Sequence, residues 1–209
     1  MLYYGDNLDV LRKHFPNNCV DLVYLDPPFN SKADYNILFK EQSGEQSVAQ
    51  IHAFTDFWHW DNVAEQTYLE LQEDPKYTSM LQFLHAFLGR NDMMAYLVMM
   101  TARLRELQRV LKPTGSLFLH CDSTASHYLK LLLDLIFGFR NFRNEVIWRR
   151  TGSHNKINRY GPIHDSILFY SKTDNYAWKY PKRPYMKGHI EEYFIKDEKG
   201  YRTNIMEMC

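Results

Sequence analysis

Four consecutive residues, Asp26-Pro27-Pro28-Phe29, combine groups that could do chemistry, and they directly follow a short apolar run at Val20–Leu25. A run of that kind is typical of a buried strand in a parallel sheet. Asp26 then lies at the carboxyl end of the strand, where open α/β sheets bind their ligands. The two prolines fix their own φ and donate no amide hydrogen, so the backbone is rigid and its carbonyls can accept hydrogen bonds. A carboxylate, a carbonyl and an aromatic ring at one strand end form a clamp for a planar ring that carries an NH2 group.

The chemistry that such a clamp suits is methylation of an exocyclic amine on a nucleobase. The lone pair of that nitrogen is delocalised into the ring, so the nitrogen is a poor nucleophile. Acceptors on both amino hydrogens, here Asp26 and the Pro27 carbonyl, would stabilise the positive charge that develops during attack. Phe29 would stack on the base, which has to be flipped out of a duplex to reach the pocket. The alternative is that these residues form only a stiff turn, because Asp and Pro favour turns for local reasons.

Two further clusters could line the same site. His120-Cys121-Asp122 closes a second expected strand, and we interpret it as pocket lining. Adjacent strand residues point to opposite faces, so this cluster would make a poor metal site, and no metal is expected. Trp58-His59-Trp60 could stack bases or cover the site, although aromatic clusters are more often part of the core.

The charged residues are unevenly distributed, although the formal net charge is +0. Residues 41–74 hold eight acids and no Lys or Arg, whereas residues 140–159 hold six bases and one acid. The six bases are Arg140, Arg143, Arg149, Arg150, Lys156 and Arg159. We interpret this basic stripe as a track for DNA phosphates, with Arg149 and Arg150 as candidate substrate-binding residues, because local charge counts for more than the total. The alternative is an ordinary solvated surface.

The elements that must hold these residues alternate between helical and strand patterns, which indicates an α/β protein. The expected helices are 8–14, 61–72, 93–111 and 125–137, and the expected strands are 20–25, 116–120, 146–149 and 166–170. Residues 30–50 are expected to form a loop. At 209 residues, 45% of them hydrophobic, the chain is long enough for one domain with a substantial core.

Composition argues against several other classes of protein. No apolar run reaches membrane-spanning length, and the first residues lack the pattern of a signal peptide. The three cysteines, Cys19, Cys121 and Cys209, are odd in number and widely spaced. A disulfide framework or a zinc site is therefore not expected, and the cysteines favour a reducing, cytoplasmic location.

Beyond these patterns, the sequence resembles the family of site-specific DNA amino-methyltransferases. It resembles in particular the adenine-N6 type, whose Asp-Pro-Pro-Phe motif precedes the target-recognition region. The matching stretches are Gly5-Asp6-Asn7-Leu8, Asp26-Pro27-Pro28-Phe29-Asn30, Asp34-Tyr35-Asn36, Ala53-Phe54-Thr55-Asp56, Trp58-His59-Trp60, Leu119-His120-Cys121-Asp122, Asn144-Glu145-Val146-Ile147-Trp148, Tyr160-Gly161-Pro162-Ile163-His164-Asp165 and Leu168-Phe169-Tyr170-Ser171. They span nearly the whole chain in the expected order.

The resemblance implies a Rossmann-like fold that uses S-adenosylmethionine as methyl donor and double-stranded DNA as substrate, as in restriction–modification systems. It also implies three sets of site residues. These are catalytic Asp26, Pro27, Pro28 and Phe29, substrate-binding Asn30 and Tyr35 beside the two arginines named above, and cofactor-binding Asp6, Asp26 and His120. Asp6 has an alternative role as a helix cap, because Asp suits that position.

The sequence departs from the family pattern in one respect. Members with this motif order carry a glycine-rich cofactor loop, Phe-x-Gly-x-Gly, after the recognition region. The chain has no such loop, because Gly89 and Gly138 each stand alone. We therefore expect an incomplete fold: a partial catalytic domain at 1–175, with an insert around 40–92, and the start of the target-recognition region at 176–209. The remainder would be a C-terminal half or a second polypeptide, with a homodimer as a further option.

Without that remainder, the strand at 20–25 would lie at an exposed apolar edge, and the isolated chain would bind S-adenosylmethionine weakly or not at all. Two other functions stay open: an RNA amino-methyltransferase, since enzymes acting on guanine N2 of ribosomal RNA share the motif, and a non-enzymatic DNA-binding remnant. Adenine is favoured over cytosine N4 by family analogy, because the cytosine group usually has Ser in place of Asp26. Cytosine C5 methylation is excluded, because the thiolate of that family follows a proline and no cysteine here does.

Overall fold

The computed structural model describes residues 1–27, 34–36, 52–55, 58–150, 155–156, 158–160, 163–180, 194–197 and 200–203. The chain divides into two compact units, Met1–Ala177 and Trp178–Cys209. The second unit contains an antiparallel hairpin of β9 (Phe194–Asp197) and β10 (Gly200–Thr203). The functions expected of residues 1–175 and 176–209 stay predictions.

The first unit is organised around a four-stranded sheet in the order β1-β4-β8-β5. Its strands are β1 (Val20–Leu25), β4 (Leu111–Cys121), β8 (His164–Ser171) and β5 (Phe142–Arg149). β1 and β4 run parallel, whereas β8 is antiparallel to both of its neighbours. The carboxyl ends of β1 and β4 therefore meet at one edge of the sheet, together with the start of β8. Each of the four strands contains an expected one, although β4 begins at Leu111 and β5 at Phe142, earlier than expected, and the α/β class is confirmed.

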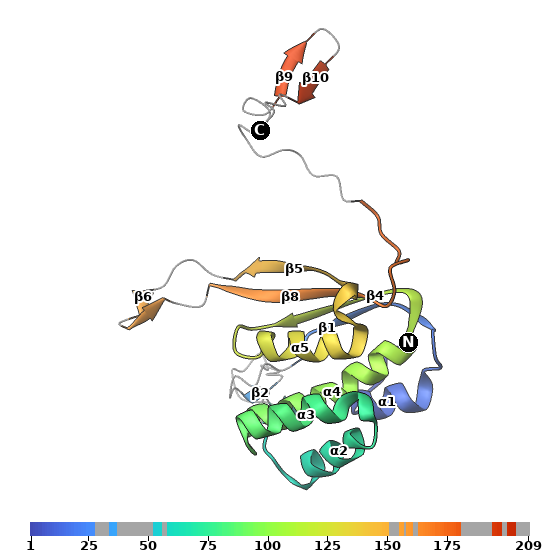
Figure 1. Cartoon of the computed structure of the whole chain (residues 1–209), viewed down its shortest axis with the longest axis vertical. Coiled ribbons are helices and arrows are strands. Elements are labelled where there is room, and N and C mark those ends of the chain that lie inside the picture. Colours follow the sequence, from blue (N-terminus) through green and yellow to red (C-terminus); the bar gives the residue numbers. More distant parts are fainter. Residues whose placement is uncertain are drawn as a thin grey trace, which may run out of the picture. The chain divides into compact units, whose positions relative to one another are not determined.

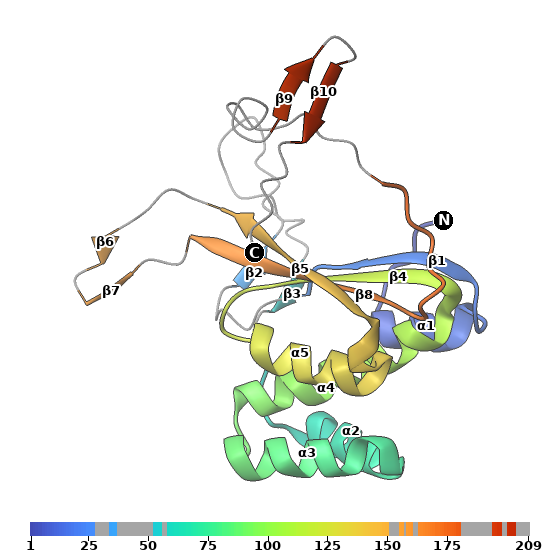
Figure 2. The ribbon, with the colours of Figure 1, turned by 45° about the horizontal axis from the view of Figure 1, so that its top comes forward.

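Five α-helices accompany the sheet in the described part of the chain: α1 (Asn7–His14), α2 (Asn62–Gln72), α3 (Pro75–Leu88), α4 (Asp92–Val110) and α5 (Ser126–Phe137). In both views α4 and α5 lie against one face of the sheet, and α2 and α3 form a further layer beyond α4 (Figures 1 and 2). None of these described helices is long and apolar enough to cross a membrane.

Helix α3 was not expected from the periodicity of the sequence. Its start is nevertheless encoded locally, because the Asp74 side chain accepts a hydrogen bond from the Lys76 amide and Pro75 occupies the first turn. Short hairpins complete the described elements: β2 (Asp34–Asn36) with β3 (His52–Thr55), and β6 (Asn155–Lys156) with β7 (Arg159–Tyr160). The loop expected at 30–50 is therefore wrong at 34–36, and its other residues lie outside the described part.

The core lies between the sheet and the two helices that cover it. Leu117 and Leu119 of β4 and Leu168 and Tyr170 of β8 are at most 3% exposed. They are alternate residues on paired strands, so they share the face that meets α4 and α5. Their helical partners in the core cluster include Leu97, Met100, Leu104, Leu129, Leu132 and Leu133.

The opposite face of the sheet is open at β1. Leu22 and Tyr24 are each 58% exposed, and among the described strands β1 pairs only with β4. The expectation of a buried strand is wrong here, because an apolar run does not reveal how many of its faces will be covered. The expectation that residues 20–25 lie at an exposed apolar edge is confirmed.

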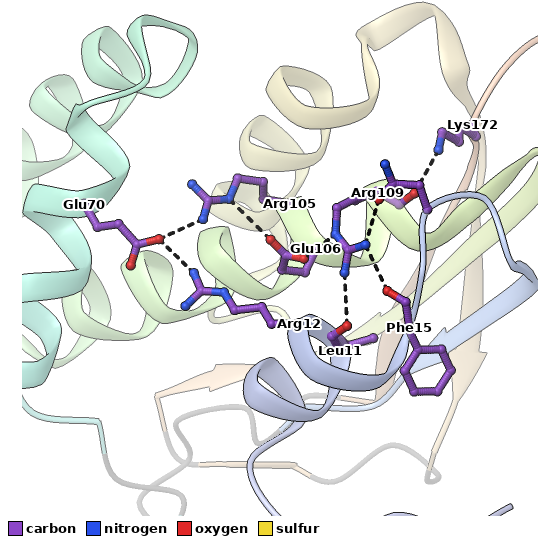
Figure 3. Close-up of polar contacts among 9 residues, drawn as sticks. Leu11, Arg12, Phe15, Glu70, Arg105, Glu106, Arg109 and Lys172 are labelled. Carbon is purple, nitrogen blue, oxygen red and sulfur yellow. Dashed lines mark hydrogen bonds and ion pairs between the residues drawn. The ribbon is translucent and has the colours of Figure 1, made fainter.

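A polar network fixes α1 against α4, and Figure 3 shows it. The Arg109 guanidinium donates to the carbonyls of Leu11 and Phe15 at 3.0 Å each, at the end of α1, where the Leu11 carbonyl also accepts from the Phe15 amide at 3.3 Å. It also donates to Glu106 Oε2 at 2.6 Å. Although α1 has no fully buried residue, Leu8 and Leu11 pack against the core, and these polar contacts add to what holds the helix in place.

Replacing Arg109 by Met is expected to lower the free energy of unfolding by about 2 kcal/mol, because it removes the charged donor to the Glu106 carboxylate and to the carbonyls of Leu11 and Phe15. Urea denaturation followed by circular dichroism measures the change. The control is Lys112→Met, since Lys112 pairs with Asp21, whose side chain is 74% exposed, and such a pair contributes at most about 1 kcal/mol. Equal losses in the two variants would contradict the role given to Arg109.

Candidate functional site

Four ionisable side chains form a row at the end of the sheet where β1, β4 and β5 finish and β8 begins. His120, near the end of β4, places Nδ1 3.0 Å from Asp26 Oδ1 and Nε2 3.1 Å from Asp165 Oδ2. The Arg150 guanidinium lies 3.2 Å from the other oxygen of Asp165. The result is a chain of contacts from Asp26 through His120 and Asp165 to Arg150.

Strand register explains why these residues meet. Leu25 pairs with Leu119, so the next residues, Asp26 and His120, come side by side at the end of the parallel pair. His120 also pairs with Ile167 on β8, and Asp165 lies two residues away on the same face.

Arg150 follows β5, and its amide donates to the Ile163 carbonyl at 2.9 Å, which brings it beside the start of β8. Because of this contact, the Arg150 guanidinium reaches Asp165 on β8. Arg150 thus joins the site from the β5 side of the sheet, whereas Asp26 joins it from β1 at the other side.

Exposure falls steeply along this chain of contacts. The Asp26 side chain is 59% exposed, His120 is 16% exposed and Asp165 is 4% exposed. Asp165 is thus a buried carboxylate that is held by two cationic or hydrogen-bonding partners. Asp26 stands at the outer end, and no side chain in the described part of the chain contacts its Oδ2. Pro27, which follows it, is buried.

The other residues expected in the catalytic and DNA-binding sets are only partly described. Pro28, Phe29 and Asn30 lie outside the described residues, so the stacking surface stays a prediction. Tyr35 lies in β2 and pairs with Phe54 in β3, but its side chain is not described. Arg149 ends β5, opposite His164, and is exposed.

Asp6 is engaged in structural contacts. Its Oδ1 accepts from the Leu8 amide at 2.7 Å and caps α1, which is the alternative that the sequence left open. Its Oδ2 accepts from Arg103 at 2.7 Å. Burial lowers the pKa of the Arg103 guanidinium, and the nearby Asp6 carboxylate opposes that shift. A cofactor-binding role for Asp6 stays a prediction.

The basic stripe does not act as a unit. Arg143 donates to Ser171 Oγ, the Thr173 carbonyl and Asp174, and it lies over the Tyr176 ring at 4.6 Å, so it ties β5 to the segment after β8. The side chains of Lys156 and Arg159 lie outside the described residues. Arg149 and Arg150 therefore remain the candidates for contact with phosphates.

The remaining candidate clusters are structural in the part that is described. Trp58 and Trp60 pack against the hydrophobic core, as the alternative interpretation of that cluster proposed. No group of three metal-binding side chains gathers among the described residues. Burial, with nearby carboxylates, raises the pKa of the Cys121 thiol to about 12.

Cys121 is accordingly expected to resist alkylation in the folded protein. With a pKa of about 12, almost none of the thiol is thiolate at pH 8, and the thiolate is the reactive form. Labelling with iodoacetamide at pH 8, followed by peptide mass spectrometry, should leave Cys121 unmodified while the partly exposed Cys19 reacts. In urea both should react, and rapid labelling of folded Cys121 would contradict the burial.

Sequence reasoning missed the role of Asp165. It lies in a stretch that resembles the family, Tyr160 to Asp165, but nothing in the local pattern marks it as a partner of His120. The one indication was that Asp165 directly precedes the strand expected at 166–170. A polar residue at that position can reach the end of the sheet where the neighbouring strands finish.

Comparison with known proteins adds a second line of observation. Residues 20–206 match a family model described as DNA methylase. The StyLTI Mod subunit of a type III restriction-modification enzyme from Salmonella typhimurium is 30% identical over 192 residues, which make up 90% of this chain and 26% of that protein. Type II methyltransferase M.EcaI from Enterobacter cloacae is 34% identical over 134 residues, which make up 61% of this chain and 30% of that protein.

This chain therefore spans only 26% and 30% of the length of these two relatives. Among solved structures, the PvuII DNA methyltransferase, described as cytosine-N4-specific, superposes with a TM-score of 0.45 at 13% identity. That match covers 82% of this chain and 49% of the other.

Proposed function

We propose, since this chain belongs to the DNA methylase family, that it takes part in the transfer of a methyl group from S-adenosylmethionine to the N6 amino group of adenine in DNA. The observation that carries the proposal is the placement of Asp26. Its carboxylate stands at the carboxyl end of β1, with Oδ1 facing His120 at 3.0 Å and no described residue in contact with Oδ2. An acceptor fixed on one side and open on the other suits an amine that must be held while it reacts.

The proposed role of this chain's residues is to bind the amino group of the target base and to accept its proton. The adenine is flipped out of the duplex, because its N6 cannot be reached inside the stack. Asp26 Oδ2 accepts a hydrogen bond from the amino group and stabilises the positive charge that develops on the nitrogen. The methyl group replaces one amino proton, and that proton passes to the carboxylate. The Pro27 carbonyl is the proposed second acceptor and Phe29 the proposed stacking surface.

S-adenosylmethionine would supply an electrophilic methyl group on a cationic sulfur. The described residues fit this cofactor in part. An open carboxylate oxygen at Asp26 suits a nearby positive charge, whereas both oxygens of Asp6 already accept hydrogen bonds from the protein. Asp26 and His120 are the residues proposed to border it.

The preference for adenine over cytosine N4 rests on Asp26, because the cytosine-N4 group usually has Ser at that position. Double-stranded DNA is the proposed substrate, with Arg149 and Arg150 as phosphate contacts. Since one relative is named as a subunit of a larger enzyme, a further polypeptide or chain segment is the proposed partner. A homodimer stays an untested alternative.

The test is to express the protein from its complete reading frame, incubate it with DNA and, in a separate reaction, with RNA, each with radiolabelled S-adenosylmethionine, and digest the products to nucleosides. The proposal expects the label in N6-methyladenine. Label in N4-methylcytosine would overturn the choice of base, and label in RNA alone would overturn the choice of nucleic acid. If no nucleic acid is labelled while DNA is still bound, the non-enzymatic alternative replaces the proposal.

A further inference from the structure

His120 is held from both sides by carboxylates. Its Nδ1 faces Asp26 at 3.0 Å and its Nε2 faces Asp165 at 3.1 Å. The contact of Nε2 with Asp165 is a hydrogen bond, and Nδ1 lies within ion-pair distance of Asp26 Oδ1. Two contacts on opposite sides of a planar ring fix its orientation about both side-chain torsions.

The inner contact of this pair is the fixed one. Asp165 is buried, and its second oxygen accepts from Arg150 at 3.2 Å. A buried carboxylate that accepts from two donors has little freedom to turn, because each alternative orientation would leave a charge without a partner. The His120 ring is therefore anchored at its Nε2 side.

The other contact of the ring, from Nδ1 to Asp26, involves a carboxylate that has few other restraints among the described residues. Asp26 is more than half exposed, and its only recorded contact in the described part of the chain is the one to His120. Exposed ion pairs contribute little to stability, so the contact has small value as a structural tie. The consequence of this contact is geometric. The contact favours one orientation of the Asp26 carboxylate, in which Oδ1 and not Oδ2 faces His120.

We propose that His120 is a positioning residue that orients Asp26 for the target amine, with Asp165 and Arg150 as its anchor. This proposal rests on the function proposed above, and it gives His120 a role distinct from binding the cofactor. Misplacing a reacting group by about 1 Å can cost about 100-fold in rate. Loss of the His120–Asp26 contact should therefore lower kcat and leave the KM for DNA unchanged.

Two substitutions separate the two sides of the ring. In His120→Asn the amide nitrogen lies about where Nδ1 was, so it can still donate to Asp26. In His120→Gln the amide nitrogen lies about where Nε2 was, so it reaches Asp165 instead. If His120 positions Asp26, the His120→Asn variant should turn over at least about tenfold faster than the His120→Gln variant. Equal kcat values, or a difference confined to KM, would overturn the proposal.

A double-mutant cycle provides an internal check on this comparison. In an Asp26→Asn background, the difference in kcat between His120→Asn and His120→Gln should disappear, because the group that the two side chains orient has changed. A difference of the same size in both backgrounds would mean that His120 acts on something else, and would also overturn the proposal.

A measurement without turnover keeps this inference separate from the proposed function. In protein labelled with 15N-histidine, Asp26→Ala should shift the His120 Nδ1 resonance more than the Nε2 resonance, and Asp165→Asn should do the reverse. If these shifts appear in a protein that methylates no nucleic acid, the proposed function fails and the positioning contact stands. If Nδ1 does not respond to Asp26→Ala, the contact itself is wrong, even in an active enzyme.

Discussion

Replacing Asp26 by alanine is expected to lower kcat for methyl transfer to DNA by at least about 100-fold, the range for removing one preorganised group that stabilises charge in a transition state. Alanine removes the acceptor that the proposed mechanism places on the amine, and it also frees His120 from its outer partner. The KM for DNA should change much less than kcat, because neither the proposed phosphate contacts of Arg149 and Arg150 nor the proposed stacking on Phe29 involves the Asp26 carboxylate directly. Transfer of labelled methyl groups over a range of DNA concentrations measures both constants.

The control lies on the same strand. Asp21 is five residues before Asp26 and pairs with Lys112 at 2.8 Å on the surface, with its side chain 74% exposed. Asp21→Ala removes a carboxylate from β1 without touching the site, so its kcat should match that of the wild type. Loss of activity in both variants would show that β1 tolerates no such change and would remove the evidence for a specific role of Asp26.

The second large effect is on stability. Leu119→Ala is expected to lower the free energy of unfolding by about 3 kcal/mol, because Leu119 is fully buried in the core and the substitution leaves a cavity. Leu22→Ala, on the neighbouring strand, should change it by no more than about 0.5 kcal/mol, because that side chain is already 58% exposed. Urea titration of both variants provides the measurement.

This pair tests the arrangement of the sheet itself. The two leucines are chemically identical and lie on adjacent strands, but one faces α4 and α5 and the other faces the open side. Similar losses for both would mean that the open face of β1 is covered in the folded protein, and the description of β1 as an exposed edge would then be wrong.

Local patterns predicted most of the elements correctly. Periodicity located α1, α2, α4 and α5, and the apolar runs located the four strands of the sheet. Helix α3 was missed because its start is marked by a capping residue, Asp74, and a proline more than by an apolar stripe. The exposure of Leu22 was also unpredictable from its own strand, since it depends on which elements from elsewhere in the sequence cover each face.

The candidate site was predictable in part for the same reason. Asp26 and His120 were expected at strand ends, and the parallel pairing of β1 with β4 brings them together. Asp165 meets His120 on one side and Arg150 on the other only because β8 lies between β4 and β5, and that order is set by long-range pairing. Local sequence carries no signal for it. The roles of Phe29, Asn30 and Tyr35 remain predictions, since their side chains lie outside the described residues.

The most direct measurement is the rate of a single turnover, with enzyme in excess over DNA and the methyl donor saturating, for the wild type and Asp26→Ala. These conditions isolate the chemical step from binding and product release. If the carboxylate at the end of β1 grips the reacting amine, the rate of that step falls by about two orders of magnitude while DNA affinity is kept. An unchanged single-turnover rate, with only DNA affinity reduced, would contradict that claim.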